Sequence, residues 1–261
     1  MAFTVHAVMP GVWHIVDCMG VCMTLLEGEN AAMLVDTGYG IEDVADFMRH
    51  MTDLPLTVFL THNHHDHAMG ARCFPETYML EADMADWDMF TNDKMRCRVL
   101  TQAIGKNLTV DEKTFLAGEI PLPKVMKPGV IDLGGLTAEI IEAPGHTPGS
   151  AVVYVPERKL LLSGDDWNPC TWLFFPQALG LREYRSNMRG IQQLPFEKVL
   201  CPHREALYDR WMFDDFFNAL TDGNLRAAEP VNIAPYEQID TCQATLPHDQ
   251  VFVFDWAKSG L

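Results

Sequence analysis

The stretch "THNHHDHAMG", residues 61–70, contains four histidines and an aspartate and directly follows the apolar run "LTVFL". The whole chain holds ten histidines, so this one segment concentrates a scarce residue type. An apolar run followed by polar residues predicts a β-strand that ends near residue 61. The cluster after that strand is either a polar turn or the first half of a metal site.

The spacing inside the cluster suits two ions. Alternate side chains of an extended segment lie on one face, so His62 and His64 can bind one ion from the same side. A turn at His65 then directs Asp66 and His67 toward a second ion, and His65 itself is expected to be a solvated spacer. Neutral imidazole combined with carboxylate suits zinc, and also iron or manganese.

Other predicted strands also end at residue types that bind metals. The run "AAMLV" ends at Asp36, "EIIEAPG" at His146, "KLLLSG" at Asp165 and "EKVLCP" at His203. Loops at one edge of a sheet meet in space even when they are far apart in sequence, and open α/β folds place their chemistry there. We therefore expect His146, Asp165 and His203 to complete the site that residues 61–70 begin.

The composition argues against several classes of partner. Nineteen basic and thirty-six acidic residues give a net charge of −17, and no cluster of Lys or Arg is visible. A chain this acidic is repelled by phosphate backbones and anionic membranes, so neither nucleic acid nor a membrane is an expected partner. No apolar run is long enough to span a bilayer, and no secretory signal is visible at the start.

The cysteines indicate the redox environment. The seven cysteines are odd in number and scattered along the chain. This pattern favours free thiols in a reducing cytosol over a disulfide framework, so we expect a cytoplasmic protein. Cys18 and Cys22 have no matching second pair, and a zinc knuckle is therefore not expected.

Alternating short apolar runs and helical patterns predict an α/β protein. Strands are predicted at 12–17, 22–28, 31–36, 56–61, 136–143, 150–156, 159–165 and 196–202, with a last one in "DQVFVFDWA". Helices are predicted at 41–51, 181–194 and 205–223. Gly223 is a plausible residue to end the third helix. The strand–helix–strand order around residues 41–51 predicts a βαβ-like unit.

Residues 80–128 depart from this alternation. Their first half has mixed helical character, and their second half is rich in Pro and Gly. We expect an excursion from the sheet that forms a mobile or variable cover over the active site and contributes to substrate choice. No repeat or linker divides the sequence, so residues 1–261 are expected to form a single domain.

Taken together, the motifs resemble those of the metallo-β-lactamase superfamily. "HNHHDH" matches its H-x-H-x-D-H signature, "PGHTPGS" its third-histidine loop, "SGD" its bridging-aspartate position and "CPH" its final histidine. "VDTG" resembles the aspartate turn that the family carries upstream, and the match runs from residue 31 to residue 203 in the right order. The resemblance implies an αβ/βα four-layer sandwich, in which two mixed β-sheets pack face to face with helices outside.

The resemblance also implies two divalent metal ions, with zinc as the first expectation and iron or manganese as alternatives. It implies two groups of ligands bridged by Asp165: His62, His64 and His146 for one ion, and Asp66, His67 and His203 for the other. Asp66 and Asp165 would be the catalytic carboxylates, because Asp66 can orient the nucleophile and accept a proton. Asp36 and Thr61 would hold the ligand loops and imidazoles in orientation.

Departures from the family pattern narrow the activity. True β-lactamases of the family have Cys or Ser where this chain has Asp165, so a glyoxalase II-like or lactonase-like activity is expected instead of antibiotic hydrolysis. The flavodiiron branch has Glu in place of His64. Arg204 follows the final histidine where Gly is more usual, which puts a guanidinium beside the site. Asp166 adds a second carboxylate, expected to be a turn or hydrogen-bonding residue more than a further ligand.

Aromatic residues after Asp165 suggest either core packing or one wall of a substrate pocket, since small-molecule sites are largely apolar with few polar anchors. The candidate substrate-binding residues are Trp167, Trp172, Phe174, Trp87 and Arg204. A compact aromatic pocket indicates a small, partly apolar substrate rather than a polymer.

The leading hypothesis is a dinuclear metallohydrolase that cleaves a thioester, lactone, other ester or phosphodiester by attack of a metal-bridging hydroxide. The alternatives are a mononuclear iron oxidoreductase of the persulfide-dioxygenase type and a non-catalytic metal-binding protein. The expected partner is a small-molecule substrate, with assembly into a homo-oligomer left open. The fold alone supports many chemistries, so the substrate class rests on analogy.

Overall fold

The first β-sheet in the computed structural model, which describes residues 3–261, has seven strands in the order β1-β2-β3-β4-β5-β6-β7. These are β1 (Thr4–Met9), β2 (Val12–Val16), β3 (Cys22–Glu27), β4 (Ala32–Val35), β5 (Leu56–Phe59), β6 (Tyr78–Met79) and β7 (Lys124–Val125). Strands β1 to β4 pair antiparallel, and β4 to β7 pair parallel. Helix α1 (Val44–Met51) joins β4 to β5, so the predicted βαβ-like unit is confirmed.

The second sheet has six strands in the order β14-β13-β11-β10-β9-β8. They are β8 (Gly129–Asp132), β9 (Thr137–Glu142), β10 (Ala151–Val155), β11 (Leu160–Leu162), β13 (Lys198–Leu200) and β14 (Tyr208–Asp209). Only β11 and β13 pair parallel here. The inner faces of the two sheets share one apolar core, in which Met33 and Phe59 of the first sheet pack with Val153 and Leu162 of the second.

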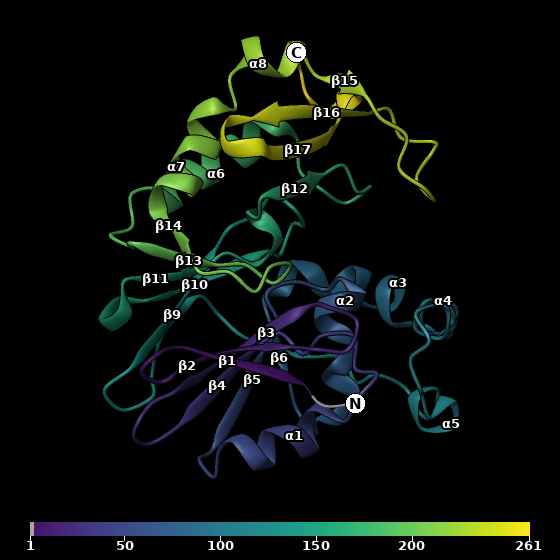
Figure 1. Ribbon diagram of the computed structural model, residues 1–261, viewed down its shortest axis with the longest axis vertical. Helices are drawn as coiled ribbons and strands as arrows, with labels where there is room; N and C mark the ends of the chain where they lie inside the picture. The colour runs from purple at the N-terminus through teal and green to yellow at the C-terminus, as the bar shows by residue number, and fades with distance from the viewer. Residues whose placement is uncertain (1–2) are drawn as a thin grey trace.

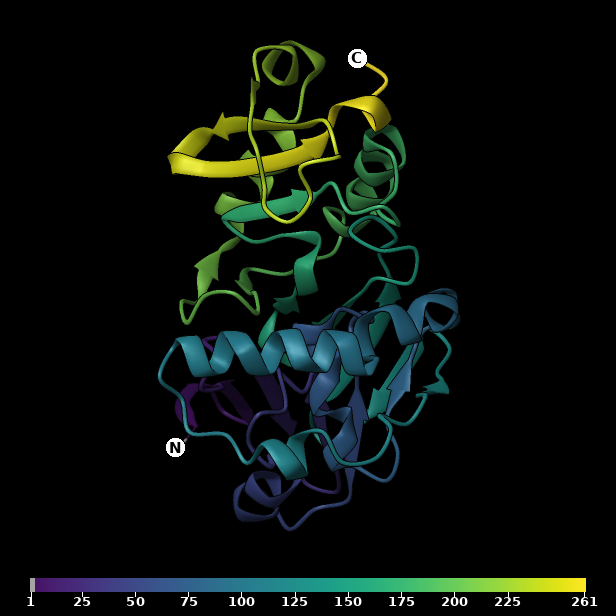
Figure 2. The same cartoon turned by 90° about the vertical axis from the view of Figure 1, so that its right-hand side faces the viewer.

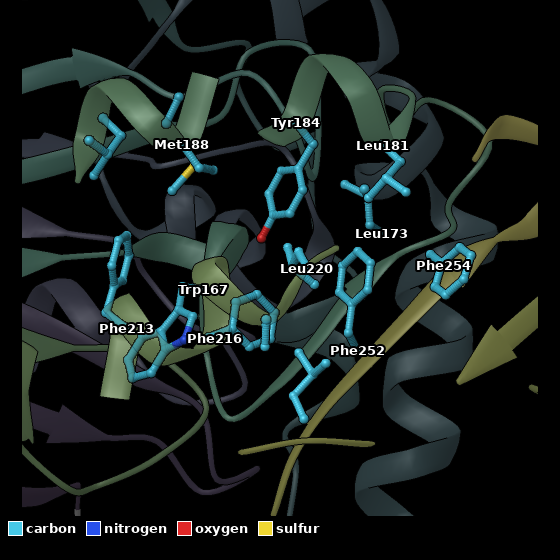
Figure 3. Packing of buried hydrophobic residues seen from close by; sticks show 14 of the residues in the cluster. Trp167, Leu173, Leu181, Tyr184, Met188, Phe213, Phe216, Leu220, Phe252 and Phe254 are labelled. Atoms are coloured by element: carbon cyan, nitrogen blue, oxygen red, sulfur yellow. The ribbon is translucent and has the colours of Figure 1, made fainter. Parts of the chain in front are cut away.

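Helices cover the outer faces of both sheets. Helix α1 buries Val44 and Met48 against the first sheet, while α6 (Leu181–Ile191) and α7 (Arg210–Ala219) lie over the second. Figure 3 shows the aromatic packing on that side, with Tyr184 of α6 near Phe216 of α7. The predicted αβ/βα sandwich of two mixed sheets is therefore confirmed.

A third sheet extends the predicted fold. It has the order β12-β17-β16-β15, with β12 (Cys170–Leu173), β15 (Glu229–Pro230), β16 (Thr241–Leu246) and β17 (Gln250–Asp255). Figure 1 shows it at the end of the molecule opposite the first sheet, beside α6 and α7. Phe252 and Phe254 of β17 belong to the same apolar cluster as these two helices, so this sheet caps the core of the second sheet.

The helix predicted at 205–223 is wrong in its bounds. Strand β14 comes first, α7 ends at Ala219, and a separate helix α8 (Asp222–Arg226) follows. The Thr221 side chain accepts a hydrogen bond from the Asn224 N–H and so begins α8, which places Gly223 inside that helix and not at a helix end.

The predicted excursion, residues 80–128, leaves the first sheet after β6 but returns to it earlier than expected, because β7 lies inside that range at Lys124–Val125. Its residues form α3 (Trp87–Thr91), α4 (Asp93–Gly105) and α5 (Glu112–Phe115). The buried guanidinium of Arg96 donates to the carbonyls of Phe115 and Gly118 and thereby holds the later part of the excursion against α4. Figure 2 shows α4 lying across the molecule, between its lower and upper parts.

Short 3-10 helices complete the chain: η1 (Met69–Cys73), η2 (Glu81–Asp86), η3 (Pro156–Arg158), η4 (Gly164–Asp166), η5 (Pro247–Asp249) and η6 (Trp256–Lys258). Among the described residues, no helix combines the length and the hydropathy needed to cross a bilayer.

Candidate metal centre

The seven candidate ligands come together at the ends of strands from both main sheets. His62 follows β5 of the first sheet, and the short helix α2 (His65–Ala68) carries the next ligands. His146, Asp165 and His203 follow β9, β11 and β13 of the second sheet. The sequence predicts that these loops meet at one edge of a single sheet. That expectation is wrong, because two sheets packed face to face bring two sets of strand ends to the same place.

The ligand atoms form two adjoining groups, each with its donor atoms within 4.8 Å of one another. The first group, named here the three-histidine group, is His62, His64 and His146 with Asp165. The second, named here the Asp66 group, is Asp66, His67 and His203.

The Asp165 carboxylate lies between the two groups. Its Oδ2 is 3.6 Å from His146 Nε2 and 3.4 Å from His67 Nε2. Its Oδ1 is 3.0 Å from His203 Nε2. One carboxylate therefore faces imidazoles of both groups, which is the arrangement expected of a bridging ligand.

Several donor atoms at this centre lack a protein partner. Among the described residues, His62 Nε2, His67 Nε2 and Asp165 Oδ1 are buried and make no hydrogen bond, since His203 Nε2 bonds to the other carboxylate oxygen of Asp165, Oδ2, at 3.1 Å. Buried polar atoms are nearly always bonded, so a group of unpartnered donors facing one point calls for a further partner. Imidazole nitrogens and carboxylate oxygens are ligands of zinc and of other divalent transition metals, and the site fits such ions.

Asp36 and Thr61 orient two of the imidazoles. The Thr61 hydroxyl donates to Asp36 at 2.9 Å, so it accepts from the His62 Nδ1–H, whose nitrogen lies 3.0 Å away. The His67 Nδ1–H donates to Asp36 Oδ2 at 2.9 Å. Because both Nδ1 atoms carry protons, the Nε2 lone pairs of His62 and His67 point into the centre. Such outer hydrogen bonds set the tautomer and orientation of metal ligands.

We expect Asp36→Asn to weaken metal binding at His67 by about 10- to 100-fold, because the amide cannot match the carboxylate as an acceptor. Asp36 has a φ of 65°, and asparagine tolerates this left-handed conformation, so the fold should survive the change. Metal titration against a competing chelator measures the effect, and Thr61→Ser, which keeps its hydroxyl, serves as the control. Unchanged affinity for both ions in Asp36→Asn would contradict the assignment.

His64 is held by Gln177, a residue that the sequence analysis missed. His64 Nε2 lies 2.7 Å from the Gln177 amide nitrogen, and His64 Nδ1 lies 2.9 Å from His146 Nε2. The amide oxygen of Gln177 has no partner. If the side-chain amide of Gln177 is rotated by half a turn, its oxygen accepts from the His64 Nε2–H. The Nδ1 atom of His64 then carries no proton and is free to bind an ion. The His146 Nδ1–H donates to the Trp172 carbonyl at 2.7 Å, which frees Nε2 in the same way.

Burial and charge divide the two groups. Burial lowers the pKa of His62, His64 and His146, so these imidazoles stay neutral, as metal binding requires. In the Asp66 group, burial by itself lowers the pKa of His203. The nearby Asp165 carboxylate outweighs this effect, so the pKa of His203 is raised. Burial likewise opposes the ionisation of Asp66, yet His67 and the neighbouring histidines lower its pKa to about 2. The two carboxylates therefore supply the negative charge of the site.

Asp166 and Asp83 hold the loop that carries His146. Asp166 accepts the His146 backbone N–H at 3.0 Å, which is the hydrogen-bonding role predicted for it. Asp83, which the sequence analysis missed, accepts from the Thr147 hydroxyl at 2.7 Å and from the Asn63 N–H at 3.2 Å. Asp83 therefore ties the loop of His62 and His64 to the loop of His146. No local pattern marks it, because its partners lie on two distant loops.

A cavity of about 470 Å³ opens onto the centre. Its walls include Trp172 and Arg204, as predicted, and also Phe90 and Arg98 from the excursion. His65, expected to be a solvated spacer, is half-buried and lines the same cavity. The excursion therefore lies on the side of the ligands, and its mobility and its part in substrate choice stay predictions.

For three residues the prediction of a place in the pocket wall is wrong, because their side chains point into the core. Trp167 is fully buried beside Phe213, and its Nε1–H donates to Gln250 at 3.2 Å. Phe174 is also fully buried, and its neighbour Phe175 faces the cavity in its place. Trp87 is buried as well, and its Nε1–H donates to a backbone carbonyl of the excursion. Both residues lie just past the end of β12 at Leu173, so the fold of the following loop, and not strand alternation, decides between Phe174 and Phe175.

Comparison with known proteins gives a consistent picture. A family model described as "Metallo-beta-lactamase superfamily" matches residues 16–203. The acyl-coenzyme A thioesterase MBLAC2 of Gallus gallus is 26% identical over 202 residues, which cover 69% of this chain and 70% of the relative. A beta-lactamase-like protein 2 homolog of Drosophila melanogaster is 28% identical over 148 residues, which cover 54% of this chain and 44% of the relative.

Among solved structures, a metallo-beta-lactamase from Pontibacter korlensis matches with a TM-score of 0.60 at 18% identity. The match covers 85% of this chain and 100% of that chain. Similarity at this level of identity shows a shared fold.

Proposed function

This chain belongs to the metallo-β-lactamase superfamily, and on that basis we propose that it is a dinuclear metal-dependent hydrolase of a small, partly apolar ester-type substrate. A thioester is the first candidate, followed by a lactone, another ester or a phosphodiester. The observation that carries the proposal is the position of Asp165, whose carboxylate lies between two groups of buried ligand atoms.

Metal ions held by these residues would supply polarisation of the substrate carbonyl and would lower the pKa of a bound water molecule toward neutrality. The side chains of this protein do the rest. His62, His64 and His146 stay neutral through burial and hold one ion without adding charge. Asp66 faces the cavity with its carboxylate ionised, so it can orient the nucleophile and accept its proton.

The preference for a thioester rests on a relative and on the cavity. The relative MBLAC2 is named an acyl-coenzyme A thioesterase, and its similarity to this chain spans most of both sequences. The cavity joins aromatic walls, which suit an acyl chain, to a centre rich in imidazole and carboxylate. In thioester hydrolysis, water adds its oxygen to the carbonyl carbon and the carbon–sulfur bond breaks, which releases a carboxylate, a thiol and one proton.

We expect about two metal ions per chain in native protein, with His62→Ala losing mainly one equivalent and His67→Ala mainly the other. The reason is that the two histidines belong to different ligand groups. Elemental analysis of both variants measures the loss. His50→Ala, an exposed histidine of α1, is the matched control and should retain both ions.

Turnover on matched thioester, lactone, oxygen-ester and phosphodiester substrates then identifies the scissile bond. A single ion in untreated and fully active protein would remove the dinuclear mechanism, and a single iron would favour the mononuclear oxidoreductase. Two bound ions without turnover on any member of the panel would favour a non-catalytic metal-binding protein.

A further inference from the structure

The cavity has an apolar side, and that side lies against the three-histidine group. The apolar wall consists of Phe90, Trp172, Phe175 and Tyr236. The His64 ring centroid is 4.5 Å from that of Phe90 and 4.7 Å from that of Phe175. Tyr236 packs edge-on against Phe175 at 5.3 Å and extends the wall outward. An apolar part of the substrate would therefore lie over His64 and His146.

The lining of the cavity also includes two arginines, Arg98 and Arg204, named here the arginine pair. Arg204 directly follows His203 of the Asp66 group, and its guanidinium donates to the His203 carbonyl at 2.8 Å. Arg98 extends from α4 and lines the same cavity as Tyr39, His65 and Asp66. The arginine pair therefore flanks the Asp66 group.

The charges on this side are unbalanced. Among the described residues, neither arginine forms an ion pair, and the guanidinium of Arg98 makes no hydrogen bond within the protein. Within residues 3–261, the acidic residues that line the cavity are the candidate ligands Asp66 and Asp165 alone. Two divalent ions would outweigh these two carboxylates, and together with the arginine pair they would make the cavity a positive region in a chain with a net charge of −17.

We propose that the substrate carries an anionic group, which the arginine pair binds, on the leaving-group side of its scissile bond. The acyl part lies on the apolar wall over the three-histidine group, and the leaving group extends past the Asp66 group to Arg98 and Arg204. Guanidinium groups bind carboxylate and phosphate through charge-assisted hydrogen bonds, so either anion satisfies the site. This inference rests on the proposed function, since it assigns an orientation to the substrate of that reaction.

The test uses two thioesters that differ in one charge. The phenylacetyl thioester of 3-mercaptopropionate carries a carboxylate on its leaving group, and that of 3-mercaptopropionamide has an uncharged amide of similar size. Wild-type holoenzyme should prefer the charged thioester in kcat/KM. Arg98→Gln should reduce that preference by about tenfold, mostly through KM, and leave the uncharged thioester within about twofold.

Lys94→Gln is the matched control, because it removes one positive charge from the same helix outside the cavity. It should leave the preference unchanged. The preference should also shrink as salt is added, since salt screens exposed charges. Calorimetric binding of the unreactive thioether analogues of both compounds gives a readout that does not depend on turnover, and the Arg98→Gln variant should bind the charged analogue about tenfold more weakly.

The outcomes separate this inference from the proposed function. Equal turnover of both thioesters by wild type, or an equal loss on both in Arg98→Gln, overturns the anionic leaving group and leaves the hydrolase intact. No turnover of either thioester, together with Arg98-dependent binding of the charged analogue, contradicts thioester hydrolysis but supports the arginine pair as an anion site. No discrimination between the two analogues by wild type overturns the arginine pair as an anion site.

Discussion

Asp165→Ala is expected to lose nearly all turnover and to release the ion of the Asp66 group. The carboxylate lies 3.0 Å from His203 Nε2 and 3.4 Å from His67 Nε2, and it also faces His146 of the other group. Asp66 is the other carboxylate among the described residues that line the cavity, and its ion-pair contacts are with His65, His67 and His203. The loss should exceed about 100-fold, which is the upper range for removing a mere orienting partner of a metal ligand.

Metal content and turnover are measured together in Asp165→Ala, on whichever substrate the wild type accepts. Asp165→Cys should leave one ion or a poorly spaced pair, because a thiolate cannot offer one oxygen to each ion. The neighbouring Asp166→Asn is the matched control, since an amide oxygen can still accept the His146 N–H. Wild-type turnover with both ions retained in Asp165→Ala would show that the carboxylate does not bridge.

Trp167→Ala is expected to destabilise the fold by about 3–5 kcal/mol, the usual cost of emptying a large buried aromatic site. Trp167 is fully buried, packs against Phe213 and Tyr208, and donates a hydrogen bond to Gln250. Figure 3 shows it among the aromatic residues that join α7 to the third sheet. Because whole domains are stable by only about 5–15 kcal/mol, this loss is a large share of the total.

Trp172→Ala is the matched comparison, five positions further along the chain. Its side chain is 36% exposed and lines the cavity, so its removal should cost little stability and raise KM for an acyl substrate. Guanidinium unfolding and steady-state kinetics of both variants measure the contrast. A small loss of stability in Trp167→Ala, or a large one in Trp172→Ala, would reverse the assignment of core and wall.

The sequence indicated those site residues that directly follow an apolar strand, because the strand and the residue type together are visible in the local sequence. His62, His64, Asp66 and His67 follow one apolar strand at spacings that need no tertiary information. His146 and His203 each follow another apolar run, and the structure brings them to the same centre. Their roles as ligands stay predictions until metal analysis is done, but their convergence follows from strand ends that meet at one edge of the sandwich.

Tertiary packing alone decided what surrounds those ligands. Trp167 and Trp172 are the same residue type in one short segment, yet one is in the core and the other lines the cavity. Trp172 lies in β12, whose pairing with β17, about eighty residues later, sets the face to which its side chain points. Trp167 precedes β12, and it is buried by its contacts with Phe213 and Gln250, which also come from later segments. Likewise, α4 carries Arg98 to the cavity only because the excursion folds back across the strand ends. The sequence by itself indicated the candidate ligands, because those residues follow apolar strands locally. The walls and charges of the cavity depend on contacts between distant segments, which no local pattern records.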